Sequence, residues 1–126
     1  MTTIKTIGVI GAGQMGNGIA HVCALAGYNV VLNDISGTAL KEGIATIEKN
    51  MTRQVSRDLI SVDDMKAGLA RISTEKEMDT LSTSDLVIEA ATENREVKEA
   101  IFRSVTQVVP DHATVSYTHL TLPTKA

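Results

Sequence analysis

The sequence predicts an α/β protein whose doubly wound, mostly parallel sheet carries helices on both faces. Short apolar runs rich in Val and Ile alternate along the chain with longer segments whose apolar residues recur every three or four positions. Aromatic residues make up only 2% of the chain, so the core must be built from aliphatic side chains, which suits a sheet covered on both sides. The turn between the first strand and the first helix is rich in glycine, which is typical of this class.

The first half of the chain predicts two strands and two helices in alternation. A β-branched apolar run at 4–10 predicts the first strand, and apolar residues at helical spacing after Gly13 predict the first helix. Gly27 is expected to end this helix as its C′ residue, so that residues 29–33 form the second strand. A long helix then begins near Ser36. The apolar positions are Met15, Ile19, Val22, Cys23 and Ala26 in the first helix and Leu40, Ile44, Ile47, Met51 and Val55 in the second.

The second half continues the alternation less evenly. Ser61 and Asp64 have the spacing of a capping box and predict a short helix that runs through Leu69. The last helix has apolar residues at helical spacing and is closed by Pro110. Its apolar positions are Val97, Ile101, Val105 and Val108. The remaining strands are expected at 71–73, where the signal is weak, at 85–90, and from 112–115 onward.

Length and charge exclude several classes of protein. With 126 residues the chain holds one domain at most. A net charge of −3 leaves no basic excess for nucleic acid or an anionic membrane, and no apolar run is long enough to span a bilayer. The single cysteine, Cys23, excludes an internal disulfide and is expected to be a buried, inert thiol. No metal-ligand spacing occurs, and the start of the chain carries no targeting signal, which favours a cytoplasmic protein.

A glycine-rich turn joins the first strand to the first helix. It reads Gly11-Ala12-Gly13-Gln14-Met15-Gly16 and matches the pattern G-x-G-x-x-G. In this setting Gly11 permits the tight turn, Gly13 lets the backbone approach a pyrophosphate, and Gly16 lets the helix pack on the strand. The first N–H groups of the helix have no intrahelical acceptor and point at the phosphates. The turn therefore predicts a dinucleotide site.

Asp34 ends the second strand, where a carboxylate can accept hydrogen bonds from the adenosine ribose of the cofactor. A carboxylate there would repel a 2′-phosphate, and no arginine follows directly in the sequence, so NAD is favoured over NADP. The alternative is an ordinary glycine turn followed by a solvent-facing Asp34. The order of strand, motif, helix, strand and acid favours the cofactor site.

Three blocks of sequence carry more information than the glycines alone. Residues 7–20 surround the turn, residues 27–35 include Asp34, and residues 85–94 read D-L-V-I-E-A-A-T-E-N. With the continuation Val97, Lys98 and Phe102, these blocks resemble the 3-hydroxyacyl-CoA dehydrogenase family over roughly residues 4–115. The resemblance implies a Rossmann-type NAD-binding domain. It also implies an enzyme that oxidises (3S)-3-hydroxyacyl-CoA to 3-oxoacyl-CoA, in fatty-acid β-oxidation or butanoate metabolism.

The resemblance assigns roles to individual residues. It implies that residues 11–16 hold the pyrophosphate, that Asp34 binds the ribose, and that Glu93 and Lys98 approach the nicotinamide half of the cofactor. Glu93 and Lys98 both follow the strand at 85–90, at the carboxyl end where ligands of such sheets bind. Without a ligand, Lys98 would be an exposed helix lysine paired with a neighbouring glutamate, and Glu93 a carboxylate favoured at a helix start.

The resemblance also suggests residues for the acyl-CoA substrate but none for catalysis. Asn50 and Arg57 fall where the second helix of the family faces CoA, and Arg57 is a candidate partner for a phosphate oxygen. Polar residues on a solvated helix need no ligand to explain them. His21 is expected to pack or to lie on the helix surface, and His112 to lie in a polar loop. No catalytic residue is assigned, and His119 receives no role.

The last eleven residues depart from the family pattern. We expect an NAD-binding domain at 1–115 and a tail at 116–126 of foreign or frameshifted origin, because the tail lacks the serine- and asparagine-rich segment of the family. The helical C-terminal domain of the family, with its catalytic His and Glu and its homodimer contacts, is expected to be absent. The chain is therefore expected to bind NAD weakly and to have no dehydrogenase activity alone.

Two other functions remain open at this point. One is another NAD-dependent hydroxyacid dehydrogenase, such as one acting on 3-hydroxyisobutyrate or 6-phosphogluconate. The block at 85–94 favours the CoA-dependent family over that alternative. The other is a non-catalytic NAD-binding regulatory module, with which a chain that carries only the cofactor part is also compatible.

Overall fold

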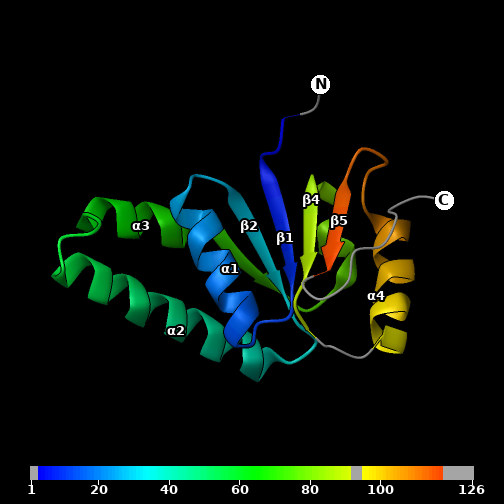
Figure 1. Cartoon of the computed structure of the whole chain (residues 1–126), viewed down its shortest axis with the longest axis horizontal. Coiled ribbons are helices and arrows are strands. Elements are labelled where there is room, and N and C mark those ends of the chain that lie inside the picture. Colours follow the sequence, from blue (N-terminus) through cyan, green and yellow to red (C-terminus); the bar gives the residue numbers. More distant parts are fainter. Residues whose placement is uncertain (1–2, 92–94, 118–126) are drawn as a thin grey trace.

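The computed structural model describes residues 3–91 and 95–117, in which a parallel sheet lies between two layers of helices (Figure 1). The strands are β1 (Thr6–Ile10), β2 (Asn29–Asn33), β3 (Ile72–Glu75), β4 (Leu86–Glu89) and β5 (Thr114–Tyr117). The helices are α1 (Gln14–Leu25), α2 (Gly37–Ser56), α3 (Val62–Ala70), the 3₁₀ helix η1 (Met78–Thr83) and α4 (Arg95–Val108). The predicted α/β class is confirmed.

The strands lie in the order β3-β2-β1-β4-β5, and every neighbouring pair is parallel. The chain first winds outward from β1 to β3 and then crosses back to β4 on the other side of β1. The sheet therefore has its topological switch point between β1 and β4, where ligands of open parallel sheets bind at the carboxyl ends of the strands. The strand order places that point beside Ile10, whose Cα partners are Asn33 on one side and Glu89 on the other.

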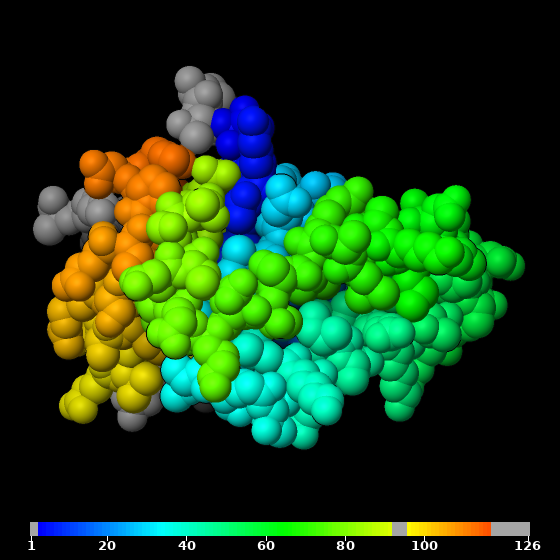
Figure 2. Space-filling model, turned by 180° about the vertical axis from the view of Figure 1, so that it is seen from behind, coloured from blue at the N-terminus to red at the C-terminus, as the bar shows by residue number. Residues whose placement is uncertain are grey.

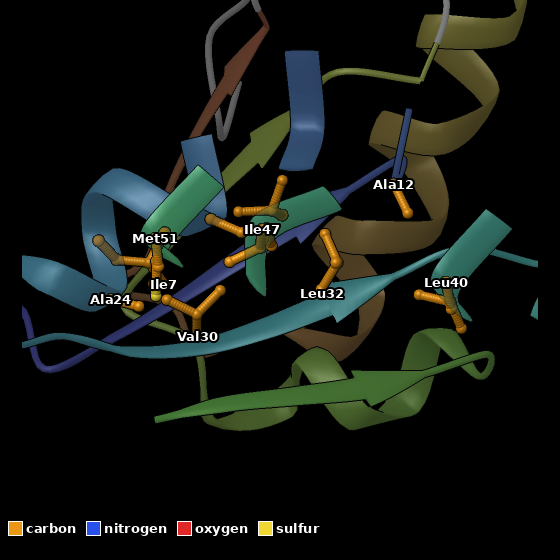
Figure 3. Packing of buried hydrophobic residues seen from close by; sticks show 10 residues of the cluster. Ile7, Ala12, Ala24, Val30, Leu32, Leu40, Ile47 and Met51 are labelled. Atoms are coloured by element: carbon orange, nitrogen blue, oxygen red, sulfur yellow. The ribbon is translucent and has the colours of Figure 1, made fainter. Parts of the chain in front are cut away.

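One face of the sheet packs against α1, α2 and α3 (Figure 3). Ile7 and Val9 of β1 point toward this face, as do Val30 and Leu32 of β2. Residues two apart in a strand share a face, because successive side chains point to opposite sides. The long helix covers them with the apolar stripe that its spacing predicts. The buried residues of this helix are Leu40, Gly43, Ile47 and Met51.

The other face packs against α4 and η1. Ile10 and Val87 point to this side together with Val115, and they meet Leu81 of η1 and Val105 of α4 in a second apolar cluster. The sequence does not predict η1, because this short segment has no long apolar period. Seen from behind, α4 lies at one side of the molecule and η1 nearer the middle, while α2 and α3 extend to the other side as a two-helix arm (Figure 2).

The buried face of α1 differs from the expected one. Met15 is 44% exposed and Val22 is 67% exposed, although both belong to the apolar series that predicted the helix. The helix instead buries Gly16, Ala20 and Ala24. Small side chains let its backbone approach the sheet closely, so the packing surface follows residue size rather than hydrophobicity.

Helix ends follow the expected chemistry. Gly27 has φ 105° and its N–H donates to Ala24, which confirms its predicted place after α1. At the end of α2 the same left-handed position is held by Asp58, with φ 58°. Ser61 and Asp64 form the predicted capping box at the start of α3, since each side chain accepts the backbone N–H of the other.

The boundaries of several elements move by a few residues. The first strand begins at Thr6 rather than residue 4, and β3 runs to Glu75 rather than 73. β5 includes residues 116 and 117 of the predicted tail, and residues 118–126 lie outside the described residues. Among the described residues, no helix combines the length and the apolar character that crossing a bilayer would require.

Candidate functional site

The glycine turn, Asp34 and the end of β4 meet at the carboxyl edge of the sheet. The N–H of Gly11 donates to the carbonyl oxygen of Asn33 at 2.7 Å, which continues the pairing of β1 and β2 into the turn. On the other side, the N–H of Ala90 donates to the carbonyl oxygen of Ile10 at 2.8 Å. The turn is therefore fixed between the two strands that flank the switch point.

Two of the three motif glycines are required by the protein itself. Gly11 has φ 100°, and a Cβ there would lie 2.7 Å from the Cα of Ala91. A Cβ on Gly16 would lie 1.6 Å from the carbonyl oxygen of Gly11, because the first turn of α1 rests directly on the loop. Neither position has room for a side chain, so these two glycines set the shape of the turn.

Gly13 is different, because apart from Gly13 itself and its two chain neighbours no described residue has an atom within 4 Å of a Cβ placed on it. Its φ of −67° is ordinary for any residue. The fold therefore does not require glycine here. The absence of a side chain leaves open space above the start of α1. No side chain caps this helix at Gly13, and its first turn carries no acidic residue. An anion can approach these N–H groups and the positive end of the helix dipole.

Asp34 links the glycine turn to the start of α2. Its Oδ2 accepts the N–H of Ala12 at 3.0 Å, and its Oδ1 accepts the N–H of Ser36 at 2.9 Å. The carboxylate is half-buried, so part of it stays accessible to a ligand that lies along the turn. The turn and the acid that the sequence predicts as parts of one site are thus in direct contact.

An apolar pocket of about 290 Å³ opens beside Asp34. The turn and the end of β2 form one wall, and the first turns of α4 form the other. Its lining residues are Ile10, Gly11, Asn33, Asp34, Ile35, Met78, Ala91, Val97 and Ile101. Ile35 is 86% exposed and Val97 is 45% exposed, so two apolar side chains stand at the rim. Such a slot next to a carboxylate suits a flat apolar ring joined to a sugar.

A second groove, of about 420 Å³, lies between the start of α1 and the first half of α2. Gly13, Gln14 and Asn17 line it from the first helix, and Glu42 and Thr46 line it from the second. The two helices meet closely at its base, since a Cβ on Gly43 would lie 2.9 Å from the carbonyl oxygen of Ala12. Gln14 and Gly13 therefore face open space on the α2 side, while Gly11 borders the apolar pocket.

Lys98 is buried, which corrects the expectation of an exposed helix lysine in the absence of a ligand. It is 1% exposed, and its Nζ forms an ion pair with Oε1 of Glu89 at the end of β4. Glu89 is 0% exposed. This partner of Lys98 is a glutamate at the end of the preceding strand. The apolar spacing of α4 predicted the opposite arrangement, with Val97 inside.

Two of the other predicted site residues lie away from this cluster. The third, Glu93, lies outside the described residues, so its predicted role is not tested. Asn50 is half-buried on α2, and Arg57 is exposed at its end. A helix of 20 residues is about 30 Å long, so Arg57 lies far from the glycine turn. The structure does not bring these two residues to the cofactor edge, and their role toward CoA stays a prediction.

The histidines and the cysteine take structural places in the described residues. His21 is buried, which is one of the two positions expected for it. Its Nε2 contacts Oε1 of Gln54 at 2.7 Å. His112 is in a turn, but its Nε2 also contacts Oδ1 of Asp85 at 2.8 Å, a partner that the sequence did not reveal. Cys23 is half-buried rather than buried, and partial burial raises the pKa of its thiol. His119 lies outside the described residues.

A parallel sheet of this order, an open glycine turn into an uncapped helix, and a carboxylate after the next strand define a dinucleotide-binding α/β domain. Comparison with known proteins identifies the family. The family model for "3-hydroxyacyl-CoA dehydrogenase, NAD binding domain" matches residues 6–124. The chain belongs to this family, and its cofactor is NAD. The match extends into the segment at 116–126, whose foreign origin stays a prediction.

Individual relatives agree with this family. A 3-hydroxybutyryl-CoA dehydrogenase of Bradyrhizobium diazoefficiens is 51% identical over 113 residues, which is 90% of this chain and 39% of that protein. A 3-hydroxyadipyl-CoA dehydrogenase of Escherichia coli is 39% identical over 87% of this chain and 23% of its own length. The crystal structure of (S)-3-hydroxybutyryl-CoA dehydrogenase from Ralstonia eutropha matches with a TM-score of 0.88 and 39% identity, over 91% of this chain and 41% of that one. This chain thus spans between 23% and 41% of the length of these relatives.

Proposed function

We propose that this chain is the cofactor-binding part of an enzyme that oxidises (3S)-3-hydroxyacyl-CoA to 3-oxoacyl-CoA. The observation that carries the proposal is the open space over Gly13, which the fold does not need and a pyrophosphate would fill. The names of the relatives support the substrate class, because a 3-hydroxybutyryl and a 3-hydroxyadipyl thioester share the 3-hydroxyacyl-CoA group.

The residues of this chain would bind and orient the cofactor. The N–H groups at the start of α1 face the pyrophosphate, Asp34 accepts the ribose hydroxyls, and the pocket beside Ile35 and Val97 takes the adenine. Lys98 stands at the β4 side of the switch point, toward the nicotinamide half. NAD supplies the hydride acceptor when it is bound.

A bound dinucleotide does not by itself remove the hydroxyl proton, for which the family uses a histidine beyond the segment described here. We therefore propose that the chain binds NAD without turnover. The homodimer, the cytoplasmic location and the contacts of Asn50 and Arg57 with CoA, which follow from the resemblance and the sequence, stay predictions that belong to the whole enzyme.

Calorimetric titration of the chain with NAD and with NADP tests the cofactor site. We expect NAD to bind and NADP to bind at least about tenfold more weakly, because a 2′-phosphate would lie against the Asp34 carboxylate. A preference for NADP, or no binding of NAD by folded protein, would contradict the proposal.

An assay of the product of the complete gene with 3-hydroxybutyryl-CoA tests the activity. We expect NADH formation by the complete product and none by this chain. If the complete product binds NAD but oxidises no hydroxyacyl-CoA, a regulatory NAD-binding module becomes the better interpretation.

A further inference from the structure

The most deeply buried acid of the described structure lies just behind the cofactor edge. Glu89 is the last residue of β4 and is 0% exposed. Its Oε1 pairs with Nζ of Lys98, and its Oε2 accepts the N–H of Ala91 at 2.5 Å. The cofactor contacts proposed above do not use this carboxylate. Its two oxygens nevertheless connect three segments, namely the end of β4, the loop that follows, and α4.

The first connection sets the position of the loop against the glycine turn. Ala91 lies so close to Gly11 that a Cβ on the glycine would be 2.7 Å from the Cα of Ala91. The carbonyl oxygen of Gly11 packs directly against Gly16, in the first turn of α1. A shift of Ala91 would therefore move the turn whose N–H groups face the pyrophosphate. Glu89 restrains that shift through its bond to the Ala91 N–H.

The second connection sets the position of α4. Lys98 points from this helix to Glu89, while Val97 and Ile101 of the same two turns line the apolar pocket opposite Asp34. Ala91 lines the pocket as well. One carboxylate thus holds both the loop and the helix that form the β4 side of the pocket. Because the two carboxylate oxygens of Glu89 are held at the end of a strand, their hydrogen bonds fix the β4 side of the pocket in position.

We propose that Glu89 is a positioning residue of the cofactor site, acting through Ala91 and Lys98 to hold the adenosine pocket at the width that the ligand needs. This inference rests on the proposed cofactor site. It predicts that the affinity for the adenosine half of the ligand depends on the length of the Glu89 side chain, even when the negative charge is kept.

The test compares Glu89→Asp and Glu89→Gln with Asp85→Asn in the same chain, by calorimetric titration with AMP and with NAD. Glu89→Asp keeps the charge but is one methylene shorter, so it cannot reach both partners. We expect both Glu89 variants to bind AMP and NAD at least tenfold more weakly, measured at a temperature where circular dichroism shows them folded. Asp85→Asn, at the opposite end of the same strand, should bind both ligands within twofold of the wild type. Glu89→Asp binding AMP like the wild type would overturn the inference.

A double variant separates position from stability. Glu89→Gln with Lys98→Met removes both buried charges while a side-chain oxygen remains for the Ala91 N–H. We expect it to unfold at a higher temperature than Glu89→Gln, because no buried charge is left without its partner, but to bind AMP at least tenfold more weakly than the wild type, because the link from β4 to α4 is gone. A double variant that binds AMP like the wild type would show that the Glu89–Lys98 pair does not set the pocket and would overturn the inference.

Hydrogen exchange gives a readout that needs no ligand. We expect the Ala91 and Gly11 amides to exchange at least tenfold faster in Glu89→Asp and at the wild-type rate in Asp85→Asn. Unchanged exchange in Glu89→Asp would overturn the inference. If the wild-type chain bound neither AMP nor NAD, the proposed function would fail, and the exchange rates would still decide whether Glu89 holds the loop.

Discussion

Strand β4 has a carboxylate at each end, and the two carboxylates contact different parts of the fold. Asp85 precedes the strand at the amino edge of the sheet, where it accepts the N–H groups of Lys5 at 2.9 Å and Thr6 at 3.1 Å and contacts His112 at 2.8 Å. Glu89 ends the strand at the carboxyl edge, fully buried, between Ala91 and Lys98. Only three residues, 86–88, separate the two carboxylates.

The comparison indicates that contacts which stabilise the fold gather at the amino edge of the sheet, whereas the proposed ligand site lies at the carboxyl edge. At the amino edge, Asp85 joins the start of β1 to the turn that precedes β5. At the carboxyl edge the same sheet presents an uncapped helix start and an apolar pocket. Substitutions at the two edges should therefore change different measurements.

The largest effect on binding is expected for Gly13→Val, at the carboxyl edge. A valine side chain would fill the space over the helix start, so the affinity for NAD should fall at least about 100-fold, or roughly 3 kcal/mol. The folded chain has room for it, so stability should change by only about 1 kcal/mol through the lost N-cap preference. Titration and thermal unfolding measure the two effects. A variant that binds NAD normally would show that the ligand does not lie here.

A smaller effect on binding is expected for Asp34→Asn. The amide keeps one acceptor but loses the charge, so NAD should bind about tenfold more weakly, as for a charge-assisted hydrogen bond of roughly 1.5 kcal/mol. Because the repulsion of a 2′-phosphate disappears, NADP should bind better than it does to the wild type. Parallel titrations with the two cofactors measure this. Unchanged discrimination would assign the preference for NAD to another residue.

The amino edge should respond to pH and not to the ligand. The N–H donors of His112, Lys5 and Thr6 lower the pKa of Asp85 from 3.8 to about 2. A carboxyl group with a lowered pKa stabilises the fold above its unfolded value near 4, and this contribution is lost as the pH falls toward 2. Asp85→Asn should therefore unfold at a lower temperature at pH 7, and this deficit should shrink at acid pH. An equal deficit at pH 7 and pH 2.5 would contradict this assignment.

The smallest effect is expected beside Asp85. Ser84 is fully buried, and its Oγ has no hydrogen-bond partner among the described residues. Leaving a buried hydroxyl unpaired is unfavourable, so Ser84→Ala should keep or raise the free energy of unfolding, by up to about 1 kcal/mol. Denaturant unfolding measures the difference, and NAD affinity should not change. A loss of stability would indicate that the hydroxyl has a partner in solution.

The sequence predicted the elements and the turn because these depend on neighbouring residues. The glycine pattern, the acid after β2 and the capping box at Ser61 are each decided within a few positions, and the structure has all three. The apolar stripe of α2 was equally clear, since a long helix on a sheet buries one continuous face.

The arrangement around α4 could not be predicted, because it depends on contacts between distant segments. A periodicity argument places Val97 inside and Lys98 outside, whereas the structure exposes the valine and buries the lysine. The reason is Glu89, which a strand pattern marks only as the end of an apolar run. Likewise, α1 packs through glycine and alanine instead of its larger apolar residues, since the turn beneath it demands close approach.

The open space over Gly13 has a consequence for the conditions under which the domain works. The groups proposed to hold a pyrophosphate there are main-chain amides, which neither gain nor lose a proton between the acid and alkaline limits of folding. Acidity should therefore leave this part of ligand recognition unaltered for as long as the polypeptide stays folded. The acid-dependent loss of stability expected from Asp85 arises at the opposite edge of the sheet, at a distance from the glycine turn.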